Sequence, residues 1–301
     1  MTTSFDAIVI GAGVAGLTAA AIVARGGLRC LCIDRMGPGG LLINLGALVD
    51  CPDLPAGTSG PDHVASLTDD AMGAGAELAI GEVQSLRPGD VWTVQTESES
   101  FTARAVIVAT GLGNGRLGID DEARFEGQGL SHCAACDGPL YAGADVMVAG
   151  ADRWALQEAI ELAETAGRTT VVTGTATLDT ADPRIRHLTS LPNVAVLPGR
   201  ILGLQGEDGL QSVVLDQGGR QAAVPVRGLF VYTDRRPATD FAGDLVTRDE
   251  GLRIRVDENQ RAGASLLYAA GDVRAGAVQS VAEAAADGRR AGQAVLGALA
   301  G

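Results

Sequence analysis

The sequence predicts an α/β protein that contains two similar strand–turn–helix–strand units. Residues 5–34 run as an apolar strand, a glycine-rich turn, a helix and a second strand. Residues 145–174 repeat that order, which is an internal repeat of the βαβ unit. The chain has 301 residues, of which 46% are hydrophobic, enough for the cores of two domains of about 150 residues each.

The first unit carries a phosphate-binding pattern. The β-rich run of residues 5–10 is followed by Gly11-Ala12-Gly13-Val14-Ala15-Gly16 and then by a helical segment. A GxGxxG turn between a strand and a helix lets backbone approach a pyrophosphate at the helix N-terminus. Asp34 ends the next strand about 20 residues further on, where a carboxylate accepts ribose hydroxyls. We therefore expect a dinucleotide at Gly11, Gly13, Gly16 and Asp34. Cys30 and Cys32 alternate on that strand and are expected in the core.

The next segments alternate in character. Residues 37–60 are rich in Gly and Pro and are expected to form an ordered loop without regular structure. Residues 62–76 are expected to form a helix, and residues 77–108 several short strands that lead into Ala109-Thr110-Gly111.

The C-terminal segment belongs with the first domain in this interpretation. An apolar strand at 266–270 leads into Gly271-Asp272, and residues 277–299 form an Ala-rich helix. The Gly-Asp pair offers an amide and a carboxylate to a ribose or ribityl chain, although a helix cap is an equally good interpretation of this motif alone.

The stretch Ser131-His132-Cys133-Ala134-Ala135-Cys136-Asp137-Gly138 indicates redox chemistry. A CxxC spacing lets the two thiols close into a disulfide and commonly lowers the pKa of one of them. Zinc would need more ligands than the pair and His132, because the other cysteines lie far upstream. A structural disulfide is the third interpretation, and it is disfavoured in a cytosolic chain.

Composition narrows the function classes. The net charge is −14 and all 23 basic residues are Arg, so lysine chemistry of the Schiff-base or Walker type is excluded. The acidic balance disfavours nucleic acid and anionic membranes as partners. No apolar run reaches the roughly 18 residues of a membrane span, and no basic region precedes the first apolar run. We therefore expect a cytoplasmic protein.

These motifs in this order, together with Gly39-Gly40, resemble the low-molecular-weight thioredoxin reductase family over essentially the whole chain. The resemblance implies two Rossmann-like three-layer domains, the second inserted into the first. Residues 1–116 and 243–301 would bind FAD, and residues 117–242 would form an NAD(P)H-binding-like domain that carries the CxxC. It implies that Cys136 faces the flavin, that Cys133 attacks the partner disulfide and that Asp137 donates and accepts protons. We also expect a homodimer.

The resemblance also implies the full FAD set. Its members lie in the glycine turn, after the strands and before the last helix, and they are Gly11, Gly13, Ala15, Gly16, Asp34, Arg35, Gly40, Leu41, Asp50, Val83, Ala109, Thr110, Gly111, Gly271, Asp272, Val278 and Gln279.

The chain departs from the family pattern in two places. The second turn reads Gly150-Ala151-Asp152-Arg153-Trp154-Ala155 instead of GxGxxA, and no basic residue follows the strand that ends at 172. Asp152 would repel a phosphate and Arg153 is the nearby cation, so we expect NADPH to be a poor reductant. In the flavin loop, Leu41 stands where the family usually has Gln and Asp50 where it usually has Asn. A carboxylate at 50 would disfavour an anionic reduced flavin.

The expected function is an FAD-dependent dithiol/disulfide oxidoreductase that acts on a thioredoxin-like protein or a small-molecule disulfide. Two alternatives stay open, a dithiol oxidase that passes electrons to oxygen and a flavin-binding module without catalysis. The donor is NADPH, NADH or a ferredoxin-like protein. An acidic ferredoxin would need an Arg patch such as Arg235-Arg236 or Arg289-Arg290.

Overall fold

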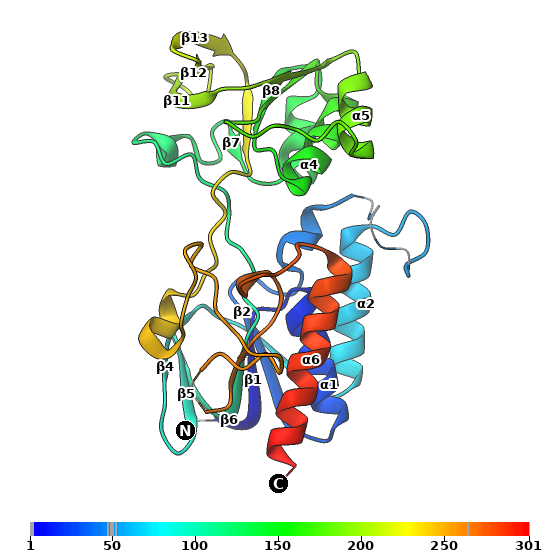
Figure 1. The fold of residues 1–301 in the computed structure, drawn as a ribbon, viewed down its shortest axis with the longest axis vertical. Coiled ribbons are helices and arrows are strands. Elements are labelled where there is room, and N and C mark those ends of the chain that lie inside the picture. Colours follow the sequence, from blue (N-terminus) through cyan, green and yellow to red (C-terminus); the bar gives the residue numbers. More distant parts are fainter. Residues whose placement is uncertain (1–2, 47, 49–50, 52, 264, 301) are drawn as a thin grey trace. The chain divides into compact units, whose positions relative to one another are not determined.

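The computed structural model describes residues 3–46, 48, 51, 53–263 and 265–300. The chain divides into two compact units, one formed by residues up to 113 together with those from 236, the other by residues 114–235. The boundaries expected from the resemblance lie three and seven residues later. Each unit is described by itself below (Figure 1).

Unit 1 is built on a sheet of seven strands among the described residues, in the order β3-β2-β1-β6-β5-β4 with β15 also paired to β6. The strands β1, β2, β3, β6 and β15 run parallel, and β4 and β5 form an antiparallel extension. Their bounds are β1 Thr3–Ile10, β2 Cys30–Asp34, β3 Glu77–Ile80, β4 Val83–Arg87, β5 Trp92–Thr96, β6 Ser100–Val108 and β15 Leu267–Ala269.

Three helices of unit 1 lie side by side on one face of this sheet, α1 (Val14–Arg25), α2 (Gly60–Gly73) and α6 (Val281–Leu299) (Figure 1). Helix α6 packs so closely on α1 that a Cβ at Gly288 would lie only 2.2 Å from the Ala15 carbonyl oxygen, which favours glycine there. The C-terminal segment thus covers the first βαβ unit. Short 3₁₀ segments complete the unit, η1 (Gly40–Asn44), η4 (Asp240–Leu245) and η5 (Gly271–Val273).

Cys30 and Cys32 are 0% and 1% exposed, which confirms their expected place in the core. Burial raises the pKa of the Cys30 thiol to about 12. Both thiols are therefore packing residues and not nucleophiles.

Several element bounds differ from the sequence-based expectation. Helix α2 spans Gly60–Gly73 and not 62–76, because the Ser59 hydroxyl caps it by accepting the Asp62 N–H, and β15 spans Leu267–Ala269 and not 266–270. Helix α6 begins at 281 and not at 277, since Gly276 has φ +70° and the Ser280 hydroxyl caps the helix by accepting the Glu283 N–H. Residues 37–60 were expected to lack regular structure, and they contain the 3₁₀ turn η1.

Unit 2 contains a parallel sheet of five strands within its described residues, in the order β10-β9-β8-β14-β7. An antiparallel sheet of three strands, β11-β12-β13, follows in the chain between β10 and β14. The strands are β7 Leu130–Ser131, β8 Asp145–Ala149, β9 Arg168–Val172, β10 Val194–Leu197, β11 Arg200–Gln205, β12 Ser212–Gln217, β13 Arg220–Pro225 and β14 Gly228–Val231. The helical segments are η2 Glu122–Phe125, α3 Ala134–Asp137, η3 Gly138–Tyr141, α4 Arg153–Thr165 and α5 Pro183–Ser190.

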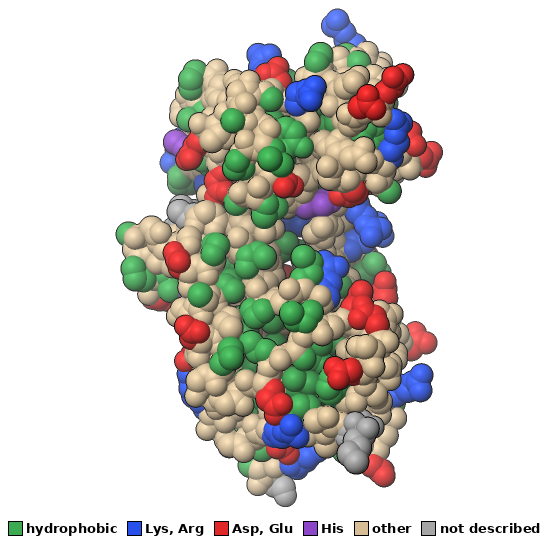
Figure 2. All heavy atoms as spheres, turned by 180° about the vertical axis from the view of Figure 1, so that it is seen from behind, with side chains coloured by type: hydrophobic (Ala, Val, Ile, Leu, Met, Phe, Trp, Pro, Cys, Tyr) green, Lys and Arg blue, Asp and Glu red, His purple; other side chains and the backbone are tan. Residues whose placement is uncertain are grey.

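The structure confirms the predicted α/β class, since each unit has a parallel sheet with helices packed on it. Acidic and basic side chains are interspersed on the face shown in Figure 2. Within the described residues, no helix combines the length and the apolar character that crossing a bilayer demands.

Candidate active site

Glycine occupies three positions of the first turn, and each position favours it for a different structural reason. Gly11 has φ +103°, and a Cβ there would lie 2.4 Å from the Ala109 carbonyl oxygen. A Cβ at Gly16 would lie 1.8 Å from the Gly11 oxygen, so α1 packs directly against the turn. At Gly13 a Cβ would meet no described atom within 4 Å, and no described side chain caps α1. The backbone N–H groups that begin α1 are thus open to a pyrophosphate.

Asp34 holds this turn in place. Its carboxylate accepts N–H groups from Ala12 at 2.8 Å, Met36 at 2.9 Å and Gly37 at 3.1 Å. An ionised carboxylate has about four acceptor positions, so one stays available for a ribose hydroxyl. Asp34 therefore positions the backbone of the turn as well as offering an acceptor to a ligand.

The carboxyl ends of the parallel strands meet at the glycine turn. The Ala109 N–H donates to the Ile10 carbonyl at 2.7 Å, and the Ala270 N–H donates to the Val108 carbonyl at 2.9 Å. Gly271 has φ +79°, and a Cβ there would lie 2.9 Å from the Ala15 Cβ. The fold thus brings residues 109–111 and 271–272 to the edge where open α/β sheets bind ligands.

The other residues expected to bind FAD lie along this edge or beside it. Gly40 opens η1, and a Cβ there would lie 3.4 Å from the Gly13 Cα. Val83 follows Gly81, whose N–H donates to the Asp34 carbonyl at 2.9 Å. The remaining members are Leu41 in η1, the exposed Arg35 after β2, Thr110 and Gly111 after β6, Asp272 in η5, and Val278 and Gln279 before α6. Asp50 lies outside the described residues, and its effect on flavin stays a prediction.

Asp287 is a buried carboxylate of this site that the sequence analysis missed. It is 0% exposed on α6, accepts the Gly271 N–H at 3.1 Å and pairs with the guanidinium groups of Arg274 and Arg290. The Gln260 amide donates to it at 3.2 Å. Asp287 on α6 therefore holds the Gly271 turn in place through the Gly271 N–H. The sequence could have indicated its burial, because Asp287, Ala291 and Val295 are spaced by four residues and therefore share one face of a helix.

At the second glycine turn the N-terminus of α4 is capped by Asp152 of the turn, and Asp152 pairs with the distant Arg235. Asp152 caps α4 by accepting the Ala155 N–H at 2.8 Å, and its other carboxylate oxygen pairs with Arg235 at 2.5 Å. The Arg235 side chain is 5% exposed and lies 5.6 Å from the Trp154 ring centre. The N-terminus of α4 thus already holds an anion, whereas no side chain in the described part of the chain caps α1.

Two expectations about charge at this turn are wrong. Asp152 does not present an uncompensated charge, and its partner is Arg235, because the parallel pairing of β8 with β14 brings their carboxyl ends together. For the same reason Arg235 is not available for docking a donor protein, since its guanidinium is covered and paired, whereas Arg236 is exposed.

Cys133 and Cys136 are joined by a disulfide, with the sulfur atoms 2.07 Å apart. They follow the carboxyl end of β7, where the short helix α3 begins at Ala134. The Cys136 N–H donates to the Cys133 sulfur at 3.0 Å, a contact that stabilises a thiolate on Cys133 after the disulfide opens. Cys133 is half-buried and Cys136 is exposed.

Asp137 is tied to the disulfide loop through Ser131. The Ser131 hydroxyl donates to the Asp137 carboxylate at 2.6 Å and accepts the Cys133 N–H at 3.1 Å. Asp137 N–H donates to the Cys133 carbonyl at 3.1 Å. A carboxyl group held beside a disulfide in this way can exchange a proton with a leaving sulfur. Ser131 was in the motif, but its spacing alone did not reveal this role.

The ring nitrogens of His132 both face oxygen atoms. Nδ1 lies 3.2 Å from the Val231 carbonyl and Nε2 lies 3.0 Å from the Glu126 carboxylate. Among the residues that the structure describes, no group of three or more His, Cys, Asp or Glu side chains is arranged to hold a metal ion.

Glu158 contacts the disulfide loop through Ala134, and the sequence analysis did not identify it. It is 0% exposed on α4, and its Oε2 atom accepts the Ala134 N–H at 2.6 Å and the Tyr232 hydroxyl at 2.7 Å. Burial raises its pKa to about 7, and the bonds from Tyr232 and Ala134 oppose that rise. The helical spacing from Ala155 and Leu162 placed it on the buried face.

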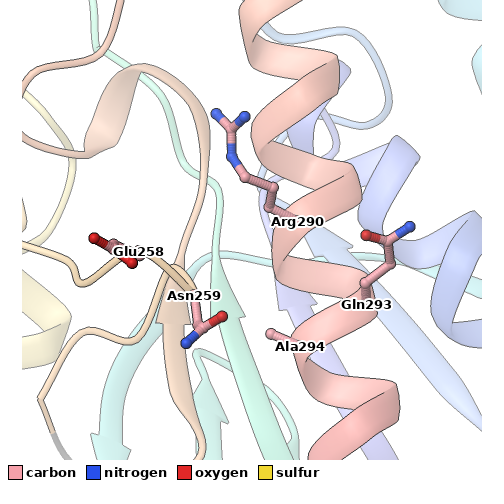
Figure 3. A pocket seen from close by; sticks show the side chains of 5 residues that line it. All are labelled: Glu258, Asn259, Arg290, Gln293 and Ala294. Carbon is pink, nitrogen blue, oxygen red and sulfur yellow. The ribbon is translucent and has the colours of Figure 1, made fainter.

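A surface hollow of about 370 Å³ lies in unit 1 (Figure 3). Arg290, Gln293 and Ala294 line it from α6, and Glu258 and Asn259 from the facing segment. The Arg290 guanidinium is already paired with Glu283 and Asp287, so it offers no unpaired charge to an anion.

Comparison with known proteins agrees with this geometry. Residues 5–288 match the family model described as pyridine nucleotide-disulphide oxidoreductase. The chain is 31% identical over 298 residues to the thioredoxin reductase of Treponema pallidum, covering 98% of this chain and 97% of that protein. It is 33% identical over 300 residues to that of Listeria monocytogenes, covering 96% and 92%.

Solved structures give the same result. The thioredoxin reductase of Lactococcus lactis superposes with a TM-score of 0.93 at 27% identity and covers 98% of this chain and 99% of that one. That of T. acidophilum has a TM-score of 0.90 at 26% identity and covers 98% of both chains. The chain therefore belongs to the pyridine nucleotide-disulphide oxidoreductase family and is a thioredoxin reductase-like flavin disulfide oxidoreductase.

Proposed function

We propose that this protein exchanges electrons between FAD and the Cys133–Cys136 pair, and from there with the disulfide of a thioredoxin-like protein or a small molecule. The observation that carries the proposal is the disulfide, with the Asp137 carboxyl linked to it through Ser131. Bound FAD would supply a two-electron carrier. The uncapped N-terminus of α1 at Gly13 would bind the FAD pyrophosphate, and the Asp34 carboxylate would accept a hydroxyl of its ribose.

In the proposed exchange, the Cys133 thiolate attacks the substrate disulfide. The Cys136 N–H, which lies 3.0 Å from the Cys133 sulfur, favours that thiolate. Asp137 gives a proton to the leaving sulfur and recovers it later. Cys136 then attacks Cys133 in the mixed disulfide, which restores the disulfide and releases the reduced product.

We further propose that NADPH is not an efficient donor. The α4 N-terminus, where a second pyrophosphate would bind, is capped by the Asp152 side chain, and that side chain is itself paired with Arg235. A pyrophosphate would have to displace this pair before it reached the backbone N–H groups. The homodimer and the cytoplasmic location stay predictions.

Anaerobic reduction of the purified protein tests both proposals. NADPH, NADH and a dithiol are offered in turn while the flavin absorbance is followed. We expect fast reduction by the dithiol, loss of that reduction in Cys133→Ser, and slow reduction by NADPH. Dithiol consumption that requires only oxygen would favour the oxidase alternative. A flavin that no dithiol reduces would contradict the proposed exchange and favour the non-catalytic module.

A further inference from the structure

The buried carboxyl group of Glu158 is not used by the proposed exchange, although it touches the loop that performs it. Its Oε2 atom accepts the N–H of Ala134, the residue directly after Cys133. Since that nitrogen is bonded to the Cys133 carbonyl carbon, covalent geometry puts the Cys133 sulfur within about 8 Å of the carboxylate. Ala134 is 4% exposed and Glu158 is 0% exposed, so little water separates the two groups.

We propose that Glu158 is a positioning residue that holds the disulfide loop through Ala134 and takes up a proton when the Cys133–Cys136 disulfide is reduced. The inference rests on the proposed function, because it needs a disulfide that opens and closes. The contact that reveals this role spans 24 positions in the chain.

The physical reason is repulsion between a thiolate on the half-buried Cys133 and the fully buried carboxylate of Glu158. A thiolate on Cys133 disfavours an ionised Glu158, and an ionised Glu158 disfavours the thiolate. The pKa of Glu158 is raised to about 7 by burial, so a small additional charge changes its protonation state at neutral pH. The Oε1 atom of Glu158 is buried and has no hydrogen-bond partner among the described residues, which leaves room for a proton there.

Other ionisable groups also face this carboxyl. Glu161 on α4 raises its pKa, while Tyr232 and Arg235 lower it. On the disulfide side the titratable neighbours are Asp137 and His132, with Tyr141 of η3 packed in the same core cluster as Tyr232. The Tyr232 hydroxyl donates directly to the Glu158 carboxylate, so removing it moves the Glu158 titration.

Reduction of the Cys133–Cys136 disulfide takes up two electrons and two protons. Two electrons from a donor dithiol, which itself becomes a disulfide, break the sulfur–sulfur bond and leave two thiolates. The donor dithiol releases two protons to the solvent as it is oxidised. One of them protonates the Cys136 thiolate, Cys133 keeps its negative charge, and the other is taken up by Glu158. Closing the disulfide reverses both proton transfers.

The first test measures how fast iodoacetamide alkylates Cys133 as the pH is changed. The holoprotein carries Cys136→Ser and Cys51→Ser, so that Cys133 is the accessible thiol, and the modified product is quantified on the tryptic peptide 125–153. Glu158→Gln is then added, because Gln keeps an oxygen for the Ala134 N–H and removes the charge. Glu164→Gln is the matched control, since Glu164 is exposed on the same helix.

We expect Glu158→Gln to react up to about tenfold faster than its parent between about pH 7 and the pH at which Cys133 is fully a thiolate. The two rates should be equal below pH 6, where Glu158 is neutral, and should converge again at higher pH. Glu164→Gln should match its parent at every pH. Tyr232→Phe keeps Glu158 and removes a hydrogen bond that lowers its pKa, so the pH at which the difference appears should rise. If Glu158→Gln fails to fold, that shift in Tyr232→Phe decides the question. A Glu158→Gln profile that superposes on its parent, or an unshifted Tyr232→Phe profile, overturns the inference.

Infrared difference spectra of the dithiol-reduced minus the oxidised protein at pH 7 give a second readout. A protonated-carboxyl band should appear on reduction and be absent in Glu158→Gln, and its presence there would overturn the inference. Neither readout uses NADPH or a physiological partner. A wild-type disulfide that dithiols cannot open would contradict the proposed function itself, whereas an opening disulfide with no carboxyl band contradicts only the role of Glu158.

Discussion

Asp152 and Arg235 form an ion pair of 2.5 Å at the N-terminus of α4, although 83 positions separate them in the chain. The same carboxylate caps the helix through the Ala155 N–H. At the equivalent place in unit 1, α1 begins after Gly13 with no described side chain as a cap. The two βαβ repeats therefore share a topology but differ in what their helix N-termini can bind.

Replacing Asp152 by Gly should improve the use of NADPH. The change frees the Ala155 N–H and the Arg235 guanidinium, both of which suit a phosphate. We expect the half-saturating NADPH concentration for flavin reduction to fall at least tenfold, which corresponds to about 1.4 kcal/mol. Stopped-flow absorbance measures it. As a control, Asp216→Ala removes the same charge from β12 of the same unit and should leave the half-saturating NADPH concentration unchanged. Fast reduction of the wild type at micromolar NADPH would contradict the interpretation.

Replacing Gly13 by Ala should weaken FAD binding without disturbing the apoprotein. The added Cβ meets no described protein atom within 4 Å, so any loss of affinity comes from the space that the ligand needs. We expect FAD affinity to fall at least tenfold, measured by flavin fluorescence on reconstitution. Gly73→Ala is the control, because its Cβ also enters open space, at the end of α2. It should keep full FAD affinity and gain up to about 1 kcal/mol of stability. Unchanged affinity in Gly13→Ala would place the pyrophosphate elsewhere.

Replacing Asp287 by Ala should destabilise unit 1. The change leaves the Arg274 guanidinium, whose side chain is 13% exposed, without its closest partner and leaves the Gly271 N–H unpaired. Breaking a buried pair from one side costs about 3 to 5 kcal/mol, and Glu283 at 3.6 Å from Arg274 keeps the expected loss near about 3 kcal/mol. Urea unfolding followed by Trp92 fluorescence, with Trp154→Phe as background, reports on this unit alone.

The control for this change is Asp70→Ala, which breaks the exposed pair with Arg25 in the same unit. Surface pairs contribute about 1 kcal/mol or less, so the unfolding midpoint should hardly move. Equal losses in Asp70→Ala and Asp287→Ala would show that burial of the Asp287 network does not govern stability.

The stability of unit 2 should fall as the pH rises from about 4.5 to about 7 because of Glu158. Burial raises the pKa of this carboxyl from 4.5 to about 7, so the folded state binds more protons than the unfolded state within that window. The free energy of unfolding then decreases with rising pH, by about 3 kcal/mol at 1.36 kcal/mol per pKa unit. Urea unfolding followed by Trp154, with Trp92→Phe as background, measures it. Glu158→Gln should remove this pH dependence, and Glu164→Gln should keep it.

Local patterns predicted most of the elements correctly. The alternation of β-rich runs with helical periodicity located the strands and helices of both βαβ units, because each element is formed by neighbours in the chain. The bounds were less certain, as the start of α6 shows. There the left-handed Gly276 and the Ser280 cap determine where the helix begins.

The sequence by itself determined the pieces of the site whose chemistry is local: the glycine turn after β1, Asp34 at the end of β2, and the two cysteines three positions apart. Their geometry follows from a single turn or a single strand end. Only the tertiary structure decided which partner each carboxylate meets: Asp152 the Arg235 guanidinium, Glu158 the Ala134 N–H, and Asp287 the Gly271 N–H. Helical periodicity shows that Glu158 and Asp287 face inward, but it carries no information about the partner. That partner comes from another element, and strand order and packing alone bring the two together.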